Sequence, residues 1–460
     1  MMEDTIAAIA TAQGEGGIGI IRISGNESKK ILEKVFVPKY LNNNESFSNK
    51  QLYYGHIVDS SSNEIIDEVL AVYMKGPSTY TTEDIVEINC HGSNVSLRKT
   101  LSLVLRNGAK LAEKGEFTKR AFLNGRIDLS QAEAVIDLIK AKTDKSFEIA
   151  LSQMEGKLSI KVRELREIIM DILVNVTVNL DYPDEDIEEV TYDELIKSLK
   201  LINDELDKLL ITADTGRIIK DGLKVTIVGK PNVGKSSLMN ALLKESRAIV
   251  TEIPGTTRDT IEEFLSINNI PVKLTDTAGI RNTKDKIEKI GIEKSKESFN
   301  QADLIIFMID GSKDLTSEDY EIIEYLKNRK SIVLLNKSDI GTKIEESYIK
   351  SIMPRAYIIK TAIKNEIGIK EIENKISELV YGGEVKQQDS MLISNVRHKD
   401  LLEKTKKSIC DAIDMAERME ALDFIEVDIK RSWELLGEII GETVTDDIID
   451  RVFERFCLGK

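Results

Sequence analysis

At 460 residues the chain is long enough for about three domains, and its 64 basic against 79 acidic residues give a net charge of −15, unlike a general nucleic-acid-binding protein. Three cysteines and no zinc-like Cys/His spacing argue against a disulfide framework and suit a reducing compartment. No apolar run approaches the 18 residues of a membrane span and the acidic start is unlike a signal peptide, so we expect a cytoplasmic protein with no membrane partner.

Residues 1–118 contain strand-like runs, such as 19–23 and 84–88, separated by Gly-rich turns. Short strands mixed with helical stretches predict an α+β domain.

Residues 119–216 are helical in pattern. Ser130 followed by Glu133 predicts a capping box at the start of one helix. Apolar residues at three- and four-residue steps over 162–176 predict a second helix, which the proline at 183 ends. We expect the first part of a helical domain in this region.

Residues 229–236 read GKPNVGKS, a complete phosphate-binding loop placed directly after the apolar run 223–228. The two glycines let the backbone wrap a phosphate chain, Lys235 is expected to reach the terminal phosphates, and the Ser236 hydroxyl to bind Mg²⁺. The loop predicts a nucleoside triphosphate site with the contacts Asn232, Val233, Gly234, Lys235, Ser236 and Ser237.

The next loop, residues 251–259, reads TEIPGTTRD. A threonine in such a loop completes the Mg²⁺ shell only when a γ-phosphate is present, so the loop can report nucleotide state. We assign Thr257 to the metal. The nucleotide contacts expected in this loop are Thr251, Glu252, Ile253, Pro254, Gly255, Thr256 and Thr257.

A short strand at 272–276 runs into the motif DTAG. An aspartate at the end of a buried strand suits a water-mediated hold on Mg²⁺, and the glycine leaves room for its N–H to meet a γ-phosphate. The expected contacts are Asp276, Thr277, Ala278 and Gly279.

Ile280 follows this motif where Ras-like proteins place a water-orienting glutamine. An aliphatic side chain cannot polarise water, so either hydrolysis is slow or another group does this work. Glu288 and Glu293 lie downstream in a helix-like segment, although the residue pattern alone is typical of solvated helix residues.

The buried strand 331–335 delivers the tetrapeptide NKSD at 336–339. Its carboxylate can accept both N1–H and N2–H₂ of guanine, donors that adenine lacks. Asn336, Lys337 and Asp339 therefore predict a guanine site and GTP as the nucleotide.

Strand-like and helix-like stretches alternate over 217–380, which predicts an α/β P-loop GTPase domain. Helical periodicity resumes over 381–460. We therefore expect a multidomain protein with an N-terminal α+β domain and a helical domain (119–216 and 381–460) into which the GTPase domain is inserted.

Along its whole length the chain resembles the MnmE (TrmE) family of bacterial and mitochondrial tRNA-modifying GTPases. Besides the GTPase motifs, the matching segments are DTIAAI at 4–9, GGIGIIRISG at 16–25, GEFTKRAFLN at 115–124 and FCLGK at 456–460.

The resemblance implies a function. The family works with an FAD-containing partner, MnmG (GidA), in a heterotetramer or larger complex. Together they add a carboxymethylaminomethyl or aminomethyl group to carbon 5 of the wobble uridine of tRNA, using 5-formyl- or methylene-tetrahydrofolate. It also implies that the N-terminal domain binds the tetrahydrofolate derivative and forms a homodimer. Arg22, Glu87 and Lys460 match the family's folate contacts, and Arg126 replaces the lysine of some members.

The resemblance also implies a K⁺ ion beside the phosphates in place of an arginine finger, with the ligands Asn232, Thr251, Ile253 and Thr256. Glu288, twelve residues beyond Asp276, matches the family's catalytic glutamate; with Asn232 and Lys235 it makes up the expected catalytic set. The resemblance also places Cys457 close to the folate site, which makes it a further catalytic candidate. The alternative interpretation is that it is an inert cysteine near the terminus.

Two alternatives stay open. One is a scaffold or ribosome-assembly GTPase without covalent RNA chemistry, because a GTPase fold does not determine its function. The other is a membrane-associated signalling GTPase, which the absence of a lipidation motif disfavours.

Overall fold

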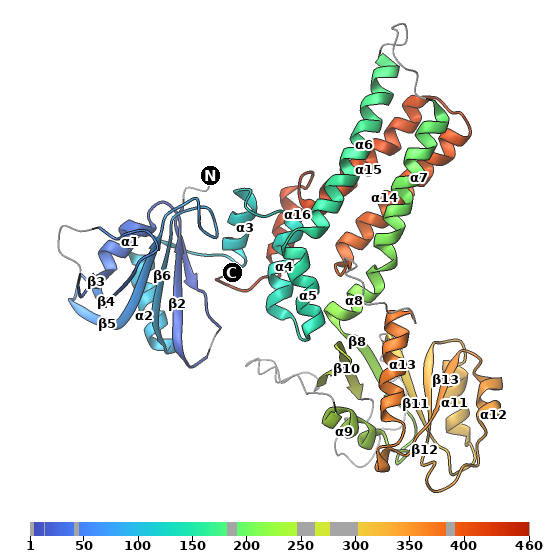
Figure 1. The fold of residues 1–460 in the computed structure, drawn as a ribbon. Helices are drawn as coiled ribbons and strands as arrows, with labels where there is room; N and C mark the ends of the chain where they lie inside the picture. Colours follow the sequence, from blue (N-terminus) through green and yellow to red (C-terminus); the bar gives the residue numbers. More distant parts are fainter. Residues whose placement is uncertain are drawn as a thin grey trace. The chain divides into compact units, whose positions relative to one another are not determined.

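The computed structural model describes residues 4–12, 14–40, 46–181, 191–245, 263–276, 302–382 and 392–459. The chain forms two compact units, whose elements are drawn in Figure 1. One comprises Met1–Ile139, Ser152–Asn203 and Lys404–Lys460, and the other Lys140–Leu151 and Asp204–Glu403. Within the described ranges, no helix has both the length and the apolar character that crossing a membrane requires.

A seven-stranded sheet organises the N-terminal part of the first unit, in the order β3-β4-β5-β6-β2-β1-β7. Neighbouring strands are antiparallel except β1 and β7. The strands are β1 Ile6–Ile9, β2 Gly16–Ser24, β3 Phe36–Pro38, β4 Leu52–Asp59, β5 Glu64–Met74, β6 Ile85–Gly92 and β7 Lys110–Leu111. The helices are α1 Ser28–Val35, α2 Asn94–Arg106 and α3 Glu116–Leu123.

One face of this sheet carries the core. Successive side chains of a strand point to opposite faces, so Tyr53 and Ile57 of β4 are buried while Tyr54 and His56 are only half-buried. The buried set shares one cluster with Leu32 of α1 and with residues of α2. One face of the sheet therefore packs against α1 and α2, and the alternate residues of its strands lie on the opposite face.

The rest of the first unit is helical, and four of its helices, α4, α5, α7 and α14, extend across the limits between the two units. The helices are α4 Leu129–Lys140, α5 Asp144–Met154, α6 Lys157–Asp181, α7 Tyr192–Ile211, α14 Val396–Glu417, α15 Leu422–Ile440 and α16 Asp446–Phe453. α6 and α15 pack along each other (Figure 1). A small cluster of buried apolar residues joins α4 to α16 through Ile136 and Phe453.

The start of α4 differs from the prediction. The N-terminal hydrogen bonds run between Asp128 and Gln131: the Gln131 N–H donates to Asp128 Oδ1 at 3.0 Å, and the Asp128 N–H donates to Gln131 Oε1 at 3.0 Å. The expected capping box of Ser130 and Glu133 is therefore wrong. Ser130 is buried and its hydroxyl bonds Asp128 and Ser159 instead, because an aspartate two residues earlier takes the capping position.

The second unit contains a six-stranded sheet in the order β13-β12-β11-β8-β10-β9, in which only the β9–β10 pair is antiparallel among the described strands. The strands are β8 Leu223–Val228, β9 Glu263–Ile267, β10 Ile270–Asp276, β11 Leu304–Asp310, β12 Ser331–Asn336 and β13 Ala356–Lys360. The helices are α8 Ala213–Asp221, α9 Lys235–Glu245, α11 Ser317–Leu326, α12 Glu346–Ile352, α13 Ile369–Tyr381 and the short 3₁₀ helix η1 Ile363–Asn365.

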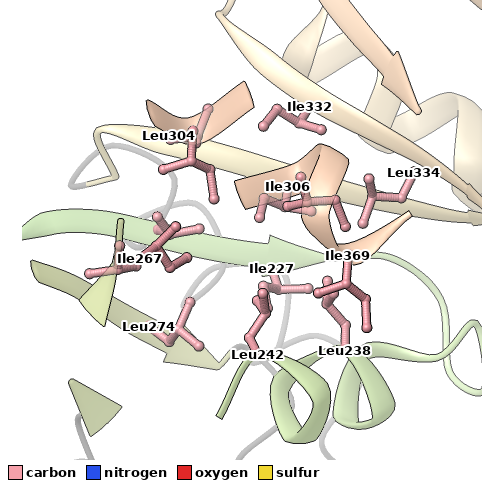
Figure 2. Close-up of a cluster of buried hydrophobic side chains, with 14 of the residues drawn as sticks. Ile227, Leu238, Leu242, Ile267, Leu274, Leu304, Ile306, Ile332, Leu334 and Ile369 are labelled. Carbon is pink, nitrogen blue, oxygen red and sulfur yellow. The ribbon is translucent and has the colours of Figure 1, made fainter. Parts of the chain in front are cut away.

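Helices cover both faces of this sheet. Figure 2 shows one face, where Leu238 and Leu242 of α9 and Ile369 of α13 pack on Ile227 and Ile306 of the strands. On the other face, buried residues of α11 and α12 pack on alternate residues of β11 and β12. Strands buried on both sides explain the continuous apolar runs of the sequence.

The predicted fold class is therefore confirmed: an α+β N-terminal part, a helical part, and an α/β P-loop domain inserted between helices. The limits placed between the domains stay predictions.

Candidate functional site

The phosphate-binding loop joins the end of β8 to the start of α9. Gly229 and Gly234 have φ of 146° and 112°, a region that favours glycine. A Cβ at Gly229 would lie 2.4 Å from Met308 O, and a Cβ at Gly234 would lie 2.4 Å from Asn336 Nδ2. The glycines are needed for backbone conformation and for close packing at once.

The polar side chains of this loop differ in their contacts and exposure. Lys235 Nζ donates to the carbonyl oxygens of Gly229 at 2.5 Å and Lys230 at 2.8 Å, so the lysine spans the loop. Asn232, Ser236 and Ser237 keep part of their surface exposed, while Val233 is buried in the core. Since α9 begins at Lys235, its N-terminal N–H groups and positive dipole end lie at the same place.

Asn336, at the end of β12, connects the phosphate loop to the segment that follows β13. Its Nδ2 donates to Val233 O at 2.7 Å, and its Oδ1 accepts from the Ile363 N–H at 3.1 Å and from Thr361 Oγ1 at 3.2 Å. The side chain is buried. Asn336 thus positions neighbouring loops, and Asp339 is exposed beside Asn365, whose amide donates to it at 3.3 Å.

Asp310, which the sequence interpretation missed, holds Lys337. Lys337 has a left-handed backbone, with φ of 66°, and its Nζ donates to Asp310 Oδ2 at 2.8 Å. Burial alone would raise the pKa of Asp310, but hydrogen bonds from Lys337 and Ser312 outweigh it and lower the pKa, so the carboxylate stays ionised. The sequence did carry a signal for Asp310, because it ends the apolar run of β11 just as Asn336 ends that of the neighbouring strand β12.

Lys230 makes a second connection from the phosphate loop. Its Nζ lies 2.5 Å from Asp319 Oδ2 and donates to Thr316 Oγ1 at 2.8 Å. Thr316 and Asp319 form the capping box of α11. The loop is therefore anchored to the helix that follows β11.

In the first unit, Arg22 of β2 and Glu87 of β6 are direct partners across the sheet. Arg22 Nε donates to Glu87 Oε1 at 2.9 Å, and both side chains keep about a fifth of their surface exposed. The Arg22 guanidinium also lies 5.8 Å from the ring of buried Phe117. Two residues far apart in sequence are thus brought together, while their role as folate contacts stays a prediction.

Arg126 approaches the same apolar cluster. Its guanidinium lies 4.8 Å from the ring of Tyr80 and donates to Tyr80 O at 2.9 Å. Tyr80 packs against the cluster that contains Phe117 and bonds Thr118 through its hydroxyl at 2.9 Å. Two arginines therefore flank one aromatic patch, in which the ring of Phe117 is fully buried and that of Tyr80 is partly buried.

The C-terminal tail lies against the N-terminal sheet. The Gly115 N–H donates to Cys457 O at 3.3 Å, and Gly459 is so close to β1 that a Cβ there would lie 2.1 Å from Ile9 O. Ile9 belongs to β1, where it pairs with Ile21 of β2, the residue before Arg22. The tail therefore contacts the strand next to the one that carries Arg22. Cys457 itself is exposed.

Several predicted site residues lie outside the described residues. For Asp276 the structure describes the backbone, which closes β10 beside β8. Outside the description lie Thr251, Glu252, Ile253, Pro254, Gly255, Thr256, Thr257, Thr277, Ala278, Gly279, Glu288 and Lys460.

A doubly wound sheet that joins a GxxxxGKS loop to an NKxD segment through one buried asparagine defines a P-loop guanine-nucleotide-binding protein. Similarity to known proteins refines this class. Residues 5–126 match the model of the GTP-binding protein TrmE N-terminus, and residues 129–457 match the MnmE helical domain. The chain belongs to the MnmE family of tRNA modification GTPases.

Its relatives are similar along the full length. "tRNA modification GTPase MnmE" of Alkaliphilus oremlandii is 54% identical over 459 residues, covering 100% of both chains. The protein of the same name from Clostridioides difficile is also 54% identical, with 100% of both chains covered. Among solved structures, Era of Aquifex aeolicus bound to GDP·AlF4 is 28% identical over 40% of this chain and 66% of that chain, with a TM-score of 0.27.

Proposed function

We propose that the chain hydrolyses GTP in order to drive the modification of tRNA at carbon 5 of the wobble uridine. The added group is carboxymethylaminomethyl or aminomethyl, and the chain works as a homodimer with the FAD-containing partner MnmG (GidA) in the cytoplasm. The observation that carries this proposal is similarity to the MnmE relatives over the whole chain, N-terminal sheet and tail included.

The nucleotide is held by the chain's own groups. The N–H groups of the loop and of the first turn of α9 meet the phosphates, Lys235 binds the terminal phosphates, and Asp339 accepts from guanine. Ser236 on α9 and Asn232 on the loop rim, both accessible to solvent, fit a cation site beside the phosphates. Ser236 with Thr257 would hold Mg²⁺, while K⁺ would be held by Asn232, Thr251, Ile253 and Thr256.

The bound cations supply positive charge against the charge that develops on the phosphates. Glu288 is proposed to orient the attacking water, the role that Ile280 cannot fill. Residues 251–257 are proposed to supply ligands to both Mg²⁺ and K⁺. Hydrolysis is therefore proposed to require that this loop closes over the bound nucleotide.

The N-terminal site is proposed to bind the tetrahydrofolate derivative, which supplies the one-carbon unit while the partner's FAD supplies redox chemistry. Arg22 and Glu87 suit the hydrogen-bonding edge of a pterin, since one donates and the other accepts. Arg126 and the terminal Lys460 suit the anionic tail of a folate. The aromatic patch between the two arginines supports this assignment.

The test is a reconstituted modification assay. Unmodified tRNA is incubated with the chain, the FAD-containing partner, GTP, K⁺, Mg²⁺, the folate and either glycine or ammonium, then digested and analysed by nucleoside mass spectrometry. We expect modified uridine that requires this chain and GTP. Arg22→Ala should lower the yield at least about tenfold while GTP hydrolysis is retained, as expected for loss of a charged hydrogen bond.

Arg98→Ala, at an exposed arginine of α2, is the matched control and should retain full yield. Cys457→Ser in the same assay tests the cysteine, since full yield excludes a nucleophilic role. Active GTP hydrolysis without any modified uridine would contradict the proposal and favour a scaffold GTPase.

A further inference from the structure

An exposed aromatic and basic patch lies at the β3–β4 end of the N-terminal sheet. Tyr40 and Tyr54 stack with ring centroids 6.4 Å apart and planes at 28°, and His56 lies 6.5 Å beyond Tyr54. Lys39 Nζ lies 5.9 Å from the Tyr40 centroid and 5.1 Å from the Tyr54 centroid. We call Lys39, Tyr40, Tyr54 and His56 the Tyr40 platform.

The backbone of the sheet builds this platform. Pro38 pairs with Gly55, and the Lys39 N–H donates to Tyr54 O at 2.9 Å, which holds Lys39 and Tyr40 beside β4. Because strand side chains alternate, Tyr54 and His56 point to the face opposite buried Tyr53. The arrangement therefore depends on ordinary strand geometry.

The fold does not need Tyr40. Its side chain is 82% exposed, so the ring contributes little buried area to stability. An exposed tyrosine that is already stacked on a second ring offers its outer face to another flat group.

Several lysines lie in the chain segments around the platform, and Glu68, the cross-strand partner of His56, is an exposed acidic residue beside it. Lys39, Lys50 and Lys75 are exposed, and none of them forms an ion pair within the described residues. Lys50 lies in the turn that precedes β4, two residues before Leu52 and on the same stretch of chain as Tyr54. This placement allows phosphates next to a stacked base to meet lysine side chains.

We propose that the Tyr40 platform binds single-stranded RNA, with an unpaired nucleobase stacked on Tyr40 and the neighbouring phosphates near Lys39 and Lys50. Sequence-tolerant recognition of unpaired bases uses aromatic stacking together with cations that follow the backbone. A second copy of the chain is the weaker occupant, because a symmetric contact would bring this lysine-bearing patch against itself. The inference rests on the proposed function, in which tRNA is the substrate.

The test is fluorescence anisotropy of the full chain with two probes, a labelled single-stranded oligouridylate and an unmodified tRNA transcript, over a range of salt concentrations. Tyr40→Ala should bind both probes roughly five- to a hundredfold more weakly, and Tyr40→Phe should retain binding. Lys39→Gln should reduce the slope of log affinity against log salt by about 0.7, the value for one phosphate contact on a single strand.

Tyr325→Ala is the matched control, since Tyr325 of α11 is also an exposed tyrosine under a cation, Arg329, at 5.8 Å. It should bind RNA like the wild type, and all variants should hydrolyse GTP at the wild-type rate. Equal RNA affinity of Tyr40→Ala and wild type would overturn the inference, and so would loss of a dimer on sedimentation with unchanged RNA affinity. If the wild-type chain binds neither probe, both the inference and the tRNA part of the proposed function are overturned. If the chain binds RNA but does not hydrolyse GTP, only the proposed function is overturned.

Discussion

Asp310 determines where Lys337 points in the guanine-reading segment. The lysine sits on a left-handed backbone that alone leaves its long side chain free to rotate, and the nearly buried Asp310 carboxylate holds the Nζ at 2.8 Å. A residue without contact to the expected ligand can therefore affect affinity through the residue that it orients.

We expect Asp310→Ala to weaken GDP binding roughly ten- to a hundredfold, because a hydrogen bond to a charged group contributes about 1.5–3 kcal/mol. Titration calorimetry with GDP measures this. Asp314→Ala is the control, since Asp314 lies in the same loop but is 85% exposed and 3.7 Å from Lys343 Nζ. Unchanged GDP affinity in Asp310→Ala would show that Lys337 needs no such anchor.

A second residue-scale prediction concerns His91. Its Nδ1 lies 2.6 Å from Asp67 Oδ1, and the hydrogen bond and charge of Asp67 raise the pKa of His91. Burial would raise the pKa of Asp67, but hydrogen bonds from Ser96 and His91 lower it, so Asp67 is ionised when His91 titrates. Because the folded pKa of His91 is raised, its contribution to stability is full below pH about 6.5 and is lost as pH rises through the folded value.

Proton NMR titration of the three histidines tests this prediction. Asp67→Asn should lower the pKa of His91, and His56→Gln should leave it unchanged while identifying one of the other signals. A His91 pKa that is the same in wild type and Asp67→Asn would contradict the role of Asp67.

At the scale of elements, the phosphate loop and β12 meet through a contact that leaves no room for a side chain at Gly234. We expect Gly234→Ala to abolish nucleotide binding, because the methyl group would collide with Asn336 and the residue would be strained at φ of 112°. Gly382→Ala separates the two effects: Gly382 has φ of 73° but open space around the position of a Cβ.

Equilibrium binding of a fluorescent GDP analogue measures both variants. Gly382→Ala should bind normally, with only the left-handed strain of about 1–2 kcal/mol in stability. Normal binding by Gly234→Ala would mean that the loop and β12 can separate without loss of the site.

How far the sequence predicts each element depends on the range of the interactions that form it. Strands β8, β10 and β12 follow from apolar runs that end in phosphate, DTAG and NKxD motifs, because burial on both faces leaves a local signal. The cap predicted at Ser130 was wrong because Asp128 takes the capping position, while Ser130 is buried and bonds Ser159 of another helix. Asp310, Lys230 with Asp319, and the Tyr40 platform depend on contacts across strands or loops, which periodicity does not encode. Family resemblance placed Arg22 and Glu87 among the expected folate contacts, but their direct pairing across β2 and β6 was not predicted.

At the scale of the whole molecule, the acidic chain concentrates its functional cations in small sets. Arg22 and Arg126 flank an aromatic patch, and Lys235 spans the phosphate loop. The C-terminal tail contacts the N-terminal sheet within the first unit. Since the P-loop domain is inserted between two helical segments of the same chain, it has two covalent connections to the helices.

We propose that this chain hydrolyses GTP by a K⁺-dependent mechanism with Glu288 as the water-orienting residue. The most direct measurement is GTP hydrolysis by the purified chain in K⁺ and in Na⁺ buffer, for wild type, Glu288→Ala and the neighbouring control Glu293→Ala. We expect strong stimulation by K⁺ in wild type and Glu293→Ala, and a loss of about a hundredfold or more in Glu288→Ala with GTP binding retained. Equal rates in the two salts, or an unimpaired Glu288→Ala, would contradict a K⁺-dependent mechanism that uses Glu288.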